Sequence, residues 1–579
     1  MKCWIVAILA LVLLLMPIVG VTAQEEPTYG GTLTWVITSE PDDLAMFRTL
    51  EATQNLLVCN FFNSFFTYTA EGNYVPDLLE SYEISKDGLT YTFHFPKDVK
   101  FHDGEPFTSE DVKFSIENIY FPYSPGFDTI FKDVAVETPD DLTLILKLKE
   151  PRNALMDKLR GRYILFYPKH LYEGTDILKN PYNNNPIGTG PFKFKEWVRG
   201  SHIEAVKNEN YFKKGLPYLD GFLCKFVYDE MSVILGVEKG EIDYMPREFP
   251  FAYWKQYSLD PQFKVEPVSY ISVSAPTLWL NHRREPFSNA KVRHAINLAM
   301  DKDDISEKVY YGLMKPVNGW IPQGWKSPFL QYNPKVPEWH RDVERANELL
   351  DEAGYPRGTN GVRFSADLYI YSERPQLDMA ELLRTHLSEV GIEVTVKPLL
   401  EPAFEKHIYM TDFDFDMAVE QSETVGSTPQ DTLFIPFSTK TIGTGPITNC
   451  AGYNNTRLNE LFDIAPIEMD MEKLQEILFE MQEILYNDMP AIPIVGWWTL
   501  VSIAQSDVMN VPHSISWRET LENVWIKAGA PSILEEVEDM IKLTTEKVTR
   551  NETLIYGVIA VQLITLVLVA AVLLRRRPT

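Results

Sequence analysis

From about residue 285 to residue 495 the sequence alternates between amphipathic helices and short apolar strands, a pattern that few architectures accommodate. Apolar side chains recur at helical spacing after Ser288, over 343–353 and over 377–390, and an alternating strand follows at 392–396. Helices that alternate with strands are typical of a layer in which helices cover a sheet. We therefore predict an α/β lobe in this half of the chain.

The same half ends with one long helix and one strand. Asp470 is the expected N-cap of a helix whose apolar side chains recur up to Leu485, and Pro490 separates this helix from a strand predicted at Ile492–Val495. The first half of the chain has more strand patterns, at 30–37 and at 91–95.

Thr108 and Asp111 have the spacing of a capping box, which predicts a helix that begins after Thr108. With 579 residues, of which 45% are hydrophobic, the chain is long enough for two or three packed units.

The N-terminus carries an apolar run. Lys2 precedes apolar residues 4–19, and the small residues 21–23 form a cleavage pattern, so we expect 1–23 to be a signal peptide; an uncleaved anchor is the alternative.

The C-terminus carries a longer apolar run. Residues 554–574 are long enough to cross a bilayer, and the arginines at 575–577 place the tail 575–579 in the cytoplasm by the positive-inside rule. Residues 530–553 have an apolar stripe at helical spacing and predict a stalk helix. We therefore expect a single-pass protein of the cell membrane whose body is extracytoplasmic.

Charge and motifs exclude several functions. The formal net charge of −27 disfavours nucleic acid as a partner, because phosphates would be repelled. Beyond the signal, only Cys59, Cys224 and Cys450 remain, so at most one disulfide can form. Histidines and cysteines show no zinc spacing, and the sequence contains no phosphate loop and no hydrolase motif. We expect no cofactor, no metal and no catalysis.

Three segments together resemble one family. Tyr91–Val112 contains Phe-His-Asp-Gly between a strand and a helix, 185–192 reads Asn-Pro-Ile-Gly-Thr-Gly-Pro-Phe, and 281–301 has the Asn…Pro-Phe…Val-Arg…Asp pattern. In this order they resemble the solute-binding proteins of dipeptide, oligopeptide and nickel ABC importers, solute-binding family 5. The resemblance extends over about residues 30 to 528. An anchoring helix in place of a lipid suggests an archaeal-like form.

The resemblance implies an α/β, two-lobed periplasmic-binding-protein-like fold with a hinge and an insert domain. The lobes would close around a small-molecule ligand and present it to the permease and ATPase subunits of an importer. The implied boundaries are lobe I at 24–66, 187–272 and 497–529, the insert at 67–186, and lobe II at 273–496.

The resemblance also directs attention to aromatic and polar residues near the cleft. Trp35 ends the first strand, Trp279 and Asn281 lie on a strand that crosses between lobes, and Trp497 and Trp498 follow the last strand of lobe II. A tryptophan offers a flat apolar face and one N–H donor, which suits peptide side chains and sugar rings. The alternative for each of them is a position in a core.

In peptide binders of this family, an aspartate after a lobe II strand pairs with the ligand's ammonium group. Here the strand is predicted at 414–419 and the loop at 420–429, where Val425 occupies the aspartate position. A buried ammonium needs a counter-charge, so either Glu423 or Glu420 substitutes or the ligand has no free amine.

Arg374 is the implied partner of a peptide carboxylate, with a surface arginine as the alternative. Carboxylates near tryptophans would also suit a cellobiose-like oligosaccharide. The acids from Asp412 to Glu423 have calcium-loop spacing, but Met417 stands where that loop needs glycine, which argues against a metal. An extracytoplasmic hydrolase is the alternative from another class.

Overall fold

The structure is a computed structural model, and it describes most of the body of the chain. The predicted signal peptide, stalk, membrane helix and tail lie outside the described residues. Within the described parts of the chain, every helix is too short or too polar to cross a bilayer. The described residues are 26–48, 52–68, 74–124, 127, 131, 133–160, 163–269, 274–321, 323, 331–372, 375–410, 413–423, 433–444, 448–496, 499–512 and 520–527.

Gly30–Val524 form one compact unit. Of the described residues, 26–29 and 525–527, with β22 (Trp525–Ile526), fall into a second unit.

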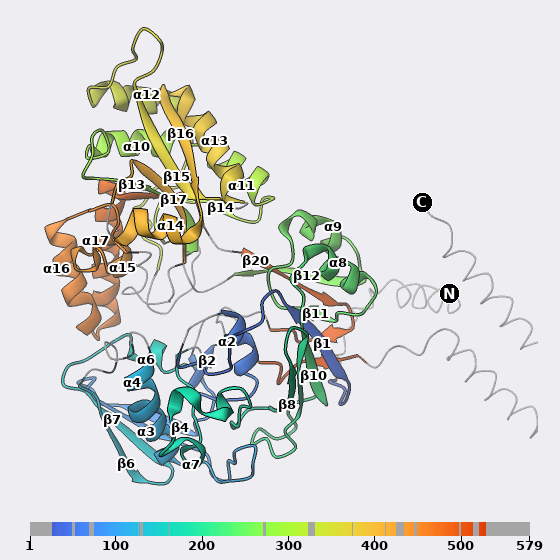
Figure 1. Ribbon diagram of the computed structural model, residues 1–579. Coiled ribbons are helices and arrows are strands. Elements are labelled where there is room, and N and C mark those ends of the chain that lie inside the picture. The colour runs from blue at the N-terminus through green and yellow to red at the C-terminus, as the bar shows by residue number, and fades with distance from the viewer. Residues whose placement is uncertain are drawn as a thin grey trace, which may run out of the picture. The chain divides into compact units, whose positions relative to one another are not determined.

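One sheet of the compact unit has seven strands drawn from distant parts of the sequence (Figure 1). Strand β1 pairs in parallel with β10 and β11, whereas β20 pairs antiparallel with both β12 and β11. Helices α8 (Glu230–Glu238) and α9 (Trp254–Ser258) pack on this sheet. The strand order is β12 (Phe263–Ser269), β20 (Thr499–Gln505), β11 (Tyr244–Met245), β1 (Thr32–Ile37), β10 (Gly221–Phe226), β9 (His202–Lys207) and β8 (Phe192–Val198).

A second, antiparallel sheet has four strands in the order β4 (Ser81–Ile84), β5 (Thr90–His94), β7 (Thr143–Lys147) and β6 (Ala135–Asp140). Helix α3 (Ser109–Phe114) begins at Thr108, and the predicted capping box with Asp111 is present. Short elements complete this part of the chain: α2 (Ala52–Val58), β2 (Phe66–Tyr68), β3 (Tyr74–Pro76), η1 (Ser115–Tyr120), α4 (Phe121–Tyr123), α6 (Leu155–Lys158), α7 (Lys169–Tyr172), η2 (Ile177–Lys179) and η3 (Pro181–Asn183).

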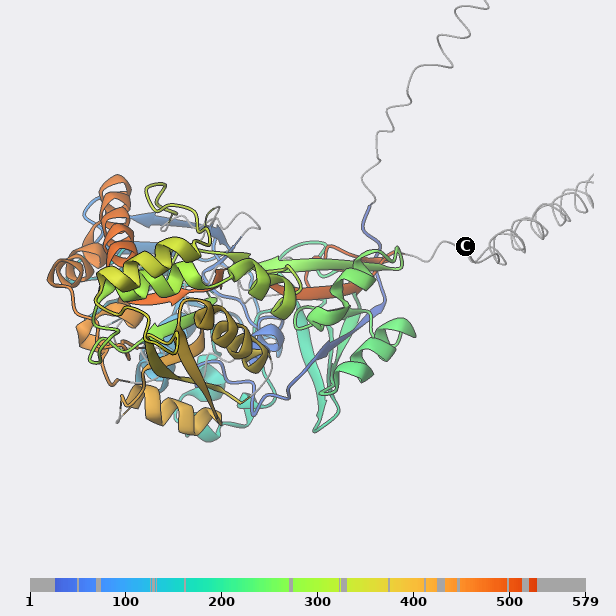
Figure 2. The ribbon, with the colours of Figure 1, turned by 90° about the horizontal axis from the view of Figure 1, so that it is seen from above.

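The third large sheet has five strands and lies between two layers of helices, as the alternating pattern predicted. Figures 1 and 2 show α10 and α12 side by side over the sheet, in the layer they share with α11 and α13. The strands are β16 (Ile392–Leu399), β15 (Phe364–Tyr371), β17 (Met417–Glu423), β13 (Ser274–Leu280) and β18 (Ala491–Pro493). The first layer is α10 (Ala290–Ala299), α11 (Lys302–Val309), α12 (Val343–Glu352) and α13 (Gln376–Glu389).

The opposite face of this sheet packs on α14 (Glu401–Glu405), η5 (Lys406–Met410), α15 (Ile435–Phe437), α16 (Thr456–Ile464) and α17 (Met471–Asp488). Residues on alternate positions of a strand point to opposite faces. Leu278 and Leu280 of β13 accordingly join the α10 layer, whereas Trp279 joins the α17 layer.

Three sequence predictions for lobe II need correction. Strand β17 runs from Met417 to Glu423, three residues later at its start than predicted, so Glu420 lies in the strand and not in the loop. The strand predicted at Ile492–Val495 is broken into β18 and β19 (Val495–Gly496), because β18 pairs with β13 whereas β19 pairs with β14 (Lys315–Pro316). The helix predicted to start at Ser288 is α10, which begins at Ala290 with Asn289 as its N-cap; the Asn289 side chain accepts from the Lys291 N–H.

The chain passes between the seven-stranded and five-stranded sheets twice. Strand β12 is followed by β13, and β19 is followed by β20. These two connections join the segments that the sequence assigned to lobe I and lobe II, and we refer to them as the crossings. Cys59, Cys224 and Cys450 are all free and buried.

Candidate functional site

The candidate site lies at one edge of the five-stranded sheet. Strands β15, β16 and β17 are parallel, so their carboxyl ends meet at the same edge, at Tyr371, Leu399 and Glu423. Strand β13 is antiparallel to β17, and it therefore begins at this edge with Ser274, directly after the first crossing. Ligands of α/β sheets bind outside the carboxyl ends of the strands.

Glu420 is a buried acid close to this edge. It pairs with Thr277 of β13, and its side chain is only 4% exposed. Burial and the nearby Glu420 carboxylate both raise the pKa of the Cys450 thiol well above its usual value, burial being the larger cause. Glu420 therefore lies near Cys450, on the face of the sheet that carries Trp279.

Trp279 lies in the interior of lobe II. Its ring centroid is 6.0 Å from that of Trp320 and 6.1 Å from that of Phe437, and its side chain is fully buried. The Nε1 atoms of Trp279 and Trp320 have no hydrogen-bond partner among the described residues. This geometry corresponds to the core alternative for Trp279.

Trp35 has a similar environment in the other sheet. It pairs with Cys224 of β10 and Tyr244 of β11, and its ring packs edge-on against Phe222. Trp35 and Trp279 thus belong to the cores of different sheets, and the structure does not bring them together.

Both side-chain amide atoms of Asn281 form hydrogen bonds to backbone groups. The Nδ2 atom donates to the carbonyls of Phe413 at 2.9 Å and Phe415 at 2.8 Å, and Oδ1 accepts from the Arg283 N–H at 3.2 Å. Asn281 therefore fixes the segment that leads into β17.

The other predicted site residues are less fully described. The backbone of Glu423 ends β17 opposite Ser274. Arg374, Trp497 and Trp498 lie outside the described residues. The roles of all these residues in ligand binding stay predictions.

The Phe-His-Asp-Gly segment has a structural role. His102 is buried, its Nε2–H donates to the Gly190 carbonyl at 3.1 Å, and its Nδ1 accepts from the Gly188 N–H at 3.3 Å. Burial lowers the pKa of His102 to about 4, so the ring is neutral at pH 7. A Cβ on Gly188 would lie 2.1 Å from the carbonyl oxygen of Phe61, which explains glycine at this position. Two of the three sequence segments therefore hold each other in place.

The structure has an unpredicted contact between the segments that the sequence assigned to the insert, 67–186, and to lobe II, 273–496. Asn153, which precedes α6, donates through Nδ2 to the carbonyls of Ala465 at 2.7 Å and Glu468 at 2.9 Å. Its backbone N–H donates to the carbonyl of Pro466 at 3.1 Å. Asn153 is 8% exposed, so these bonds are shielded from water. We call this contact the Asn153 latch. An asparagine just before a helix is common in sequences, so nothing in the sequence marks Asn153 as a contact residue.

Among the described residues, no group of histidine, cysteine, aspartate or glutamate side chains is arranged to hold a metal ion. Asp414 and Asp416 instead form ion pairs with Arg284.

Comparison with known proteins identifies the family. Residues 73–445 match the family described as bacterial extracellular solute-binding proteins, family 5 Middle. The oligopeptide-binding protein AppA of Bacillus subtilis is 30% identical over 419 residues, which cover 68% of this chain and 74% of that protein.

The glutathione-binding protein GsiB of Pectobacterium atrosepticum is 29% identical over 341 residues, or 58% of this chain. The chain spans 63% of the length of that relative.

Solved structures share the fold. The structure of AppA from Bacillus subtilis with a nonapeptide has a TM-score of 0.67 and 24% identity, covering 86% of this chain and all of that one. The substrate-binding protein CtaP from Listeria monocytogenes has a TM-score of 0.75 and 22% identity, with the same coverage. These matches confirm the two-lobed α/β fold.

Solute-binding proteins of family 5 are non-enzymatic components of transport, which agrees with the expectation of binding without catalysis. The family match covers more than half of the chain. The chain belongs to the bacterial extracellular solute-binding proteins of family 5.

Proposed function

We propose that this protein is the extracytoplasmic solute-binding component of an ABC importer and that its ligand is a short peptide. The observation that carries the proposal is that the chain passes twice between two separate sheets, and that Glu423, at the end of β17, lies opposite Ser274, the first strand residue after the first crossing. Two connections of this kind are the form that a hinge takes in proteins whose domains close around a ligand.

The peptide class is supported by charge at the strand ends. Glu423 ends β17, Glu420 lies three residues earlier in the same strand, and Arg374 follows β15, the strand next to β17, by three residues in sequence. We propose that Glu423 or Glu420 pairs with the ammonium group of a peptide and that Arg374 pairs with its carboxylate. Two opposite charges at neighbouring strand ends suit a zwitterionic ligand.

The aromatic residues would act around this charge pair. In the proposal, Trp497 and Trp498, which stand between β19 and β20 in sequence, contact the peptide side chains during closure. Trp35, Trp279 and Asn281 support the two sheets from within.

Relatives named for peptides support this choice. AppA of Bacillus subtilis is named an oligopeptide-binding protein, and DppA of Helicobacter pylori was solved with the peptide STSA. Relatives are also named for glutathione and heme. None of these four names refers to an oligosaccharide. A cellobiose-like sugar is therefore kept as the alternative ligand, which the titration below tests.

We further propose that the predicted signal peptide directs export, that residues 554–574 anchor the protein in the membrane, and that permease and ATPase subunits receive the ligand. Retention by a helix would correspond to an archaeal-like surface protein. A hydrolase is the rival from another class, and it would convert a bound peptide into fragments.

The test is calorimetric titration of the full chain, purified in detergent, with a pool of tetra- to nonapeptides, the same pool N-acetylated, and cellobiose. We expect binding of the free peptides, weakened at least about tenfold by acetylation because a buried carboxylate loses its partner. Mass spectrometry of the recovered peptides should show them intact.

Glu423→Gln and Glu420→Gln identify the acid, and Glu344→Gln, on the exposed face of α12, is the control. Binding of cellobiose without peptides would replace the peptide assignment by the sugar. Cleaved peptides would establish the hydrolase.

A further inference from the structure

The loop that leads into α16 carries a sequence triplet that has no part in the proposed function. Asn454-Asn455-Thr456 has the form Asn-x-Ser/Thr in which x is not proline, and such a triplet can accept a sugar on its asparagine in an exported protein. The sequence contains one other triplet of this form, at 551–553, which lies outside the described residues. A triplet of this length also occurs by chance, so the environment of Asn454 in the folded chain decides its use.

The residues on both sides of Asn454 are anchored in lobe II. The Asn449 side chain holds the backbone of Tyr453, since its Nδ2 donates to the Tyr453 carbonyl at 2.7 Å and its Oδ1 accepts from the Tyr453 N–H at 3.0 Å. The Tyr453 hydroxyl and the Asn455 Nδ2 donate to Oδ2 of Asp488 at 2.6 Å and 2.9 Å. Asn455 also caps α16, because its Oδ1 accepts from a backbone N–H of the first turn. The loop around Asn454 is therefore held in one conformation.

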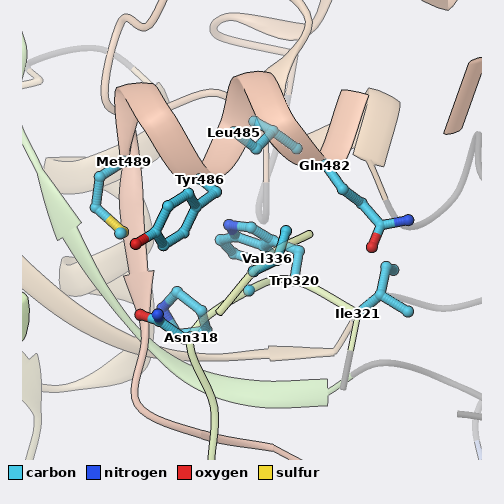
Figure 3. A pocket seen from close by; sticks show the side chains of 10 residues that line it. Asn318, Trp320, Ile321, Val336, Gln482, Leu485, Tyr486 and Met489 are labelled. Atoms are coloured by element: carbon cyan, nitrogen blue, oxygen red, sulfur yellow. The ribbon is translucent and has the colours of Figure 1, made fainter. Parts of the chain in front are cut away.

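The end of α17 that carries Asp488 is itself tightly packed. Figure 3 shows Leu485, Tyr486 and Met489 from this end, which line a cavity together with Trp320. The cavity has a volume of about 10 Å³, which holds about one water molecule. Asp488 therefore gives the loop before α16 a fixed support.

Asn454 and Thr456 are the exposed residues of this fixed loop. Both side chains are exposed, whereas Tyr453 before them is buried. The backbone of Asn455, between them, is extended, with a φ of −131° and a ψ of 119°. Side chains on either side of an extended residue lie on the same side of the chain. The amide of Asn454 and the hydroxyl of Thr456, the two groups that define the triplet, are therefore presented together.

The orientation of the Asn454 amide follows from its neighbour Asn459. Oδ1 of Asn459 accepts from the Thr439 N–H at 3.3 Å, so Nδ2 of Asn459 is the atom that donates to Oδ1 of Asn454, at 3.1 Å. In the part of the chain that the structure describes, Nδ2 of Asn454 has no hydrogen-bond partner. The nitrogen that would receive a sugar thus belongs to an exposed side chain and is not engaged in the fold.

We propose that Asn454 is a glycosylation site, modified on the extracytoplasmic side of the membrane by transfer of a sugar chain from a lipid-linked phosphate donor. The Nδ2 atom attacks the anomeric carbon of the first sugar, and the bond from this carbon to the phosphate oxygen breaks with its electron pair on the oxygen. The amide gives up one proton, so the product is an uncharged N-linked sugar and a lipid phosphate. The inference rests on the extracytoplasmic location that belongs to the proposed function.

A sugar at this position is compatible with the contact between the insert and lobe II. Helix α16 has nine residues, which at 1.5 Å per residue separate its two ends by about 14 Å. Asn454 lies before the first end, whereas the latch carbonyls of Ala465 and Glu468 follow the other end. The sugar would therefore be attached at the end of α16 opposite the Asn153 latch.

The test is peptide mapping by mass spectrometry of the full chain, purified in detergent from the cells that naturally produce it. Trypsin cleaves after Lys440 and Arg457, and the peptide between them contains the triplet of Asn454 and no other. We expect this peptide to be heavier by a whole number of sugar residues, with the sugar on Asn454. An unmodified peptide, or a sugar on another asparagine of the same peptide, would overturn the proposal.

Matched variants test the triplet itself. Asn454→Gln and Thr456→Val should both abolish the added mass, since the first moves the amide and the second replaces only a hydroxyl by a methyl group. Thr456→Ser keeps the hydroxyl and should keep the sugar, as should Asn487→Gln, at an exposed asparagine of lobe II outside a triplet. Retention of the sugar by Thr456→Val would refute the inference.

Calorimetric titration of the same sample with peptides separates this inference from the proposed function. Peptide binding by a chain whose Asn454 carries no sugar would refute the inference alone. A chain that carries the sugar but binds no peptide would refute the proposed function alone.

Discussion

The Asn153 latch predicts how strongly lobe contact contributes to ligand affinity. The substitution Asn153→Ala removes the two hydrogen bonds from Nδ2 to the carbonyls of Ala465 and Glu468 and leaves the backbone bond to Pro466. In an open form the amide and both carbonyls would be solvated, so the loss falls on the closed form alone. This asymmetry makes the latch a measure of closure.

The magnitude follows from the net value of a buried hydrogen bond, about 0.5–1.5 kcal/mol. Two such bonds stabilise the contact by about 1–3 kcal/mol, which corresponds to roughly a 5- to 150-fold increase in Kd for a ligand that requires closure. Because the encounter takes place in the open form, the increase should appear in the dissociation rate and hardly in the association rate.

The assay is stopped-flow fluorescence of the full chain with the best peptide from the calorimetric screen. Asn210→Ala, an exposed asparagine in the segment assigned to lobe I, is the matched control and should leave both rates unchanged. A dissociation rate of Asn153→Ala within twofold of the parent protein would show that the latch does not take part in ligand retention.

Three further outcomes can be checked on the same protein. His102 has a pKa of about 4 in the folded chain and about 6.5 in the unfolded chain, so on acidification the unfolded chain is protonated first. The free energy of unfolding should therefore fall by up to about 3 kcal/mol as the pH drops from 6.5 to 4. Urea denaturation of His102→Gln should show a smaller dependence of this free energy on pH over that range. Gly190→Ala would bring Cβ within 2.5 Å of the Phe61 backbone and should lower Tm by many degrees, far more than Gly319→Ala, whose Cβ meets only Val336 at 3.3 Å; equal losses would contradict the packing argument. Glu423→Gln should weaken peptide binding about 30-fold or more if Glu423 carries the ammonium, and an unchanged Kd would transfer that role to Glu420.

Local signals predicted much of the fold. The capping box at Thr108 and the N-cap at Asp470 depend on side chains two or three residues from the backbone they bind, and both are present. The extent of β17 was wrong because the run Glu420–Glu423 looks polar, whereas its pairing is set by β13, more than a hundred residues earlier in the chain. The break between β18 and β19 likewise depends on two different partner strands.

The site was harder to predict than the fold. Trp35 and Trp279 fit a binding surface by residue type, but only the sheet neighbours show that both rings are buried. Asn153 and Ala465 are separated by 312 positions. A contact over that distance cannot be deduced from spacing along the chain.

The position of β20 has a consequence for synthesis. This strand, at 499–505, lies between β12 and β11, so the last strand of the seven-stranded sheet to leave the ribosome is an internal one. A nascent chain that ends at residue 496 would already hold every strand of the five-stranded sheet, whereas β11 would present an unpaired edge and β12 would lack its partner strand. The five-stranded sheet can therefore be complete while the seven-stranded sheet still waits for an internal strand, and a chaperone that covers open sheet edges would be needed most in that interval.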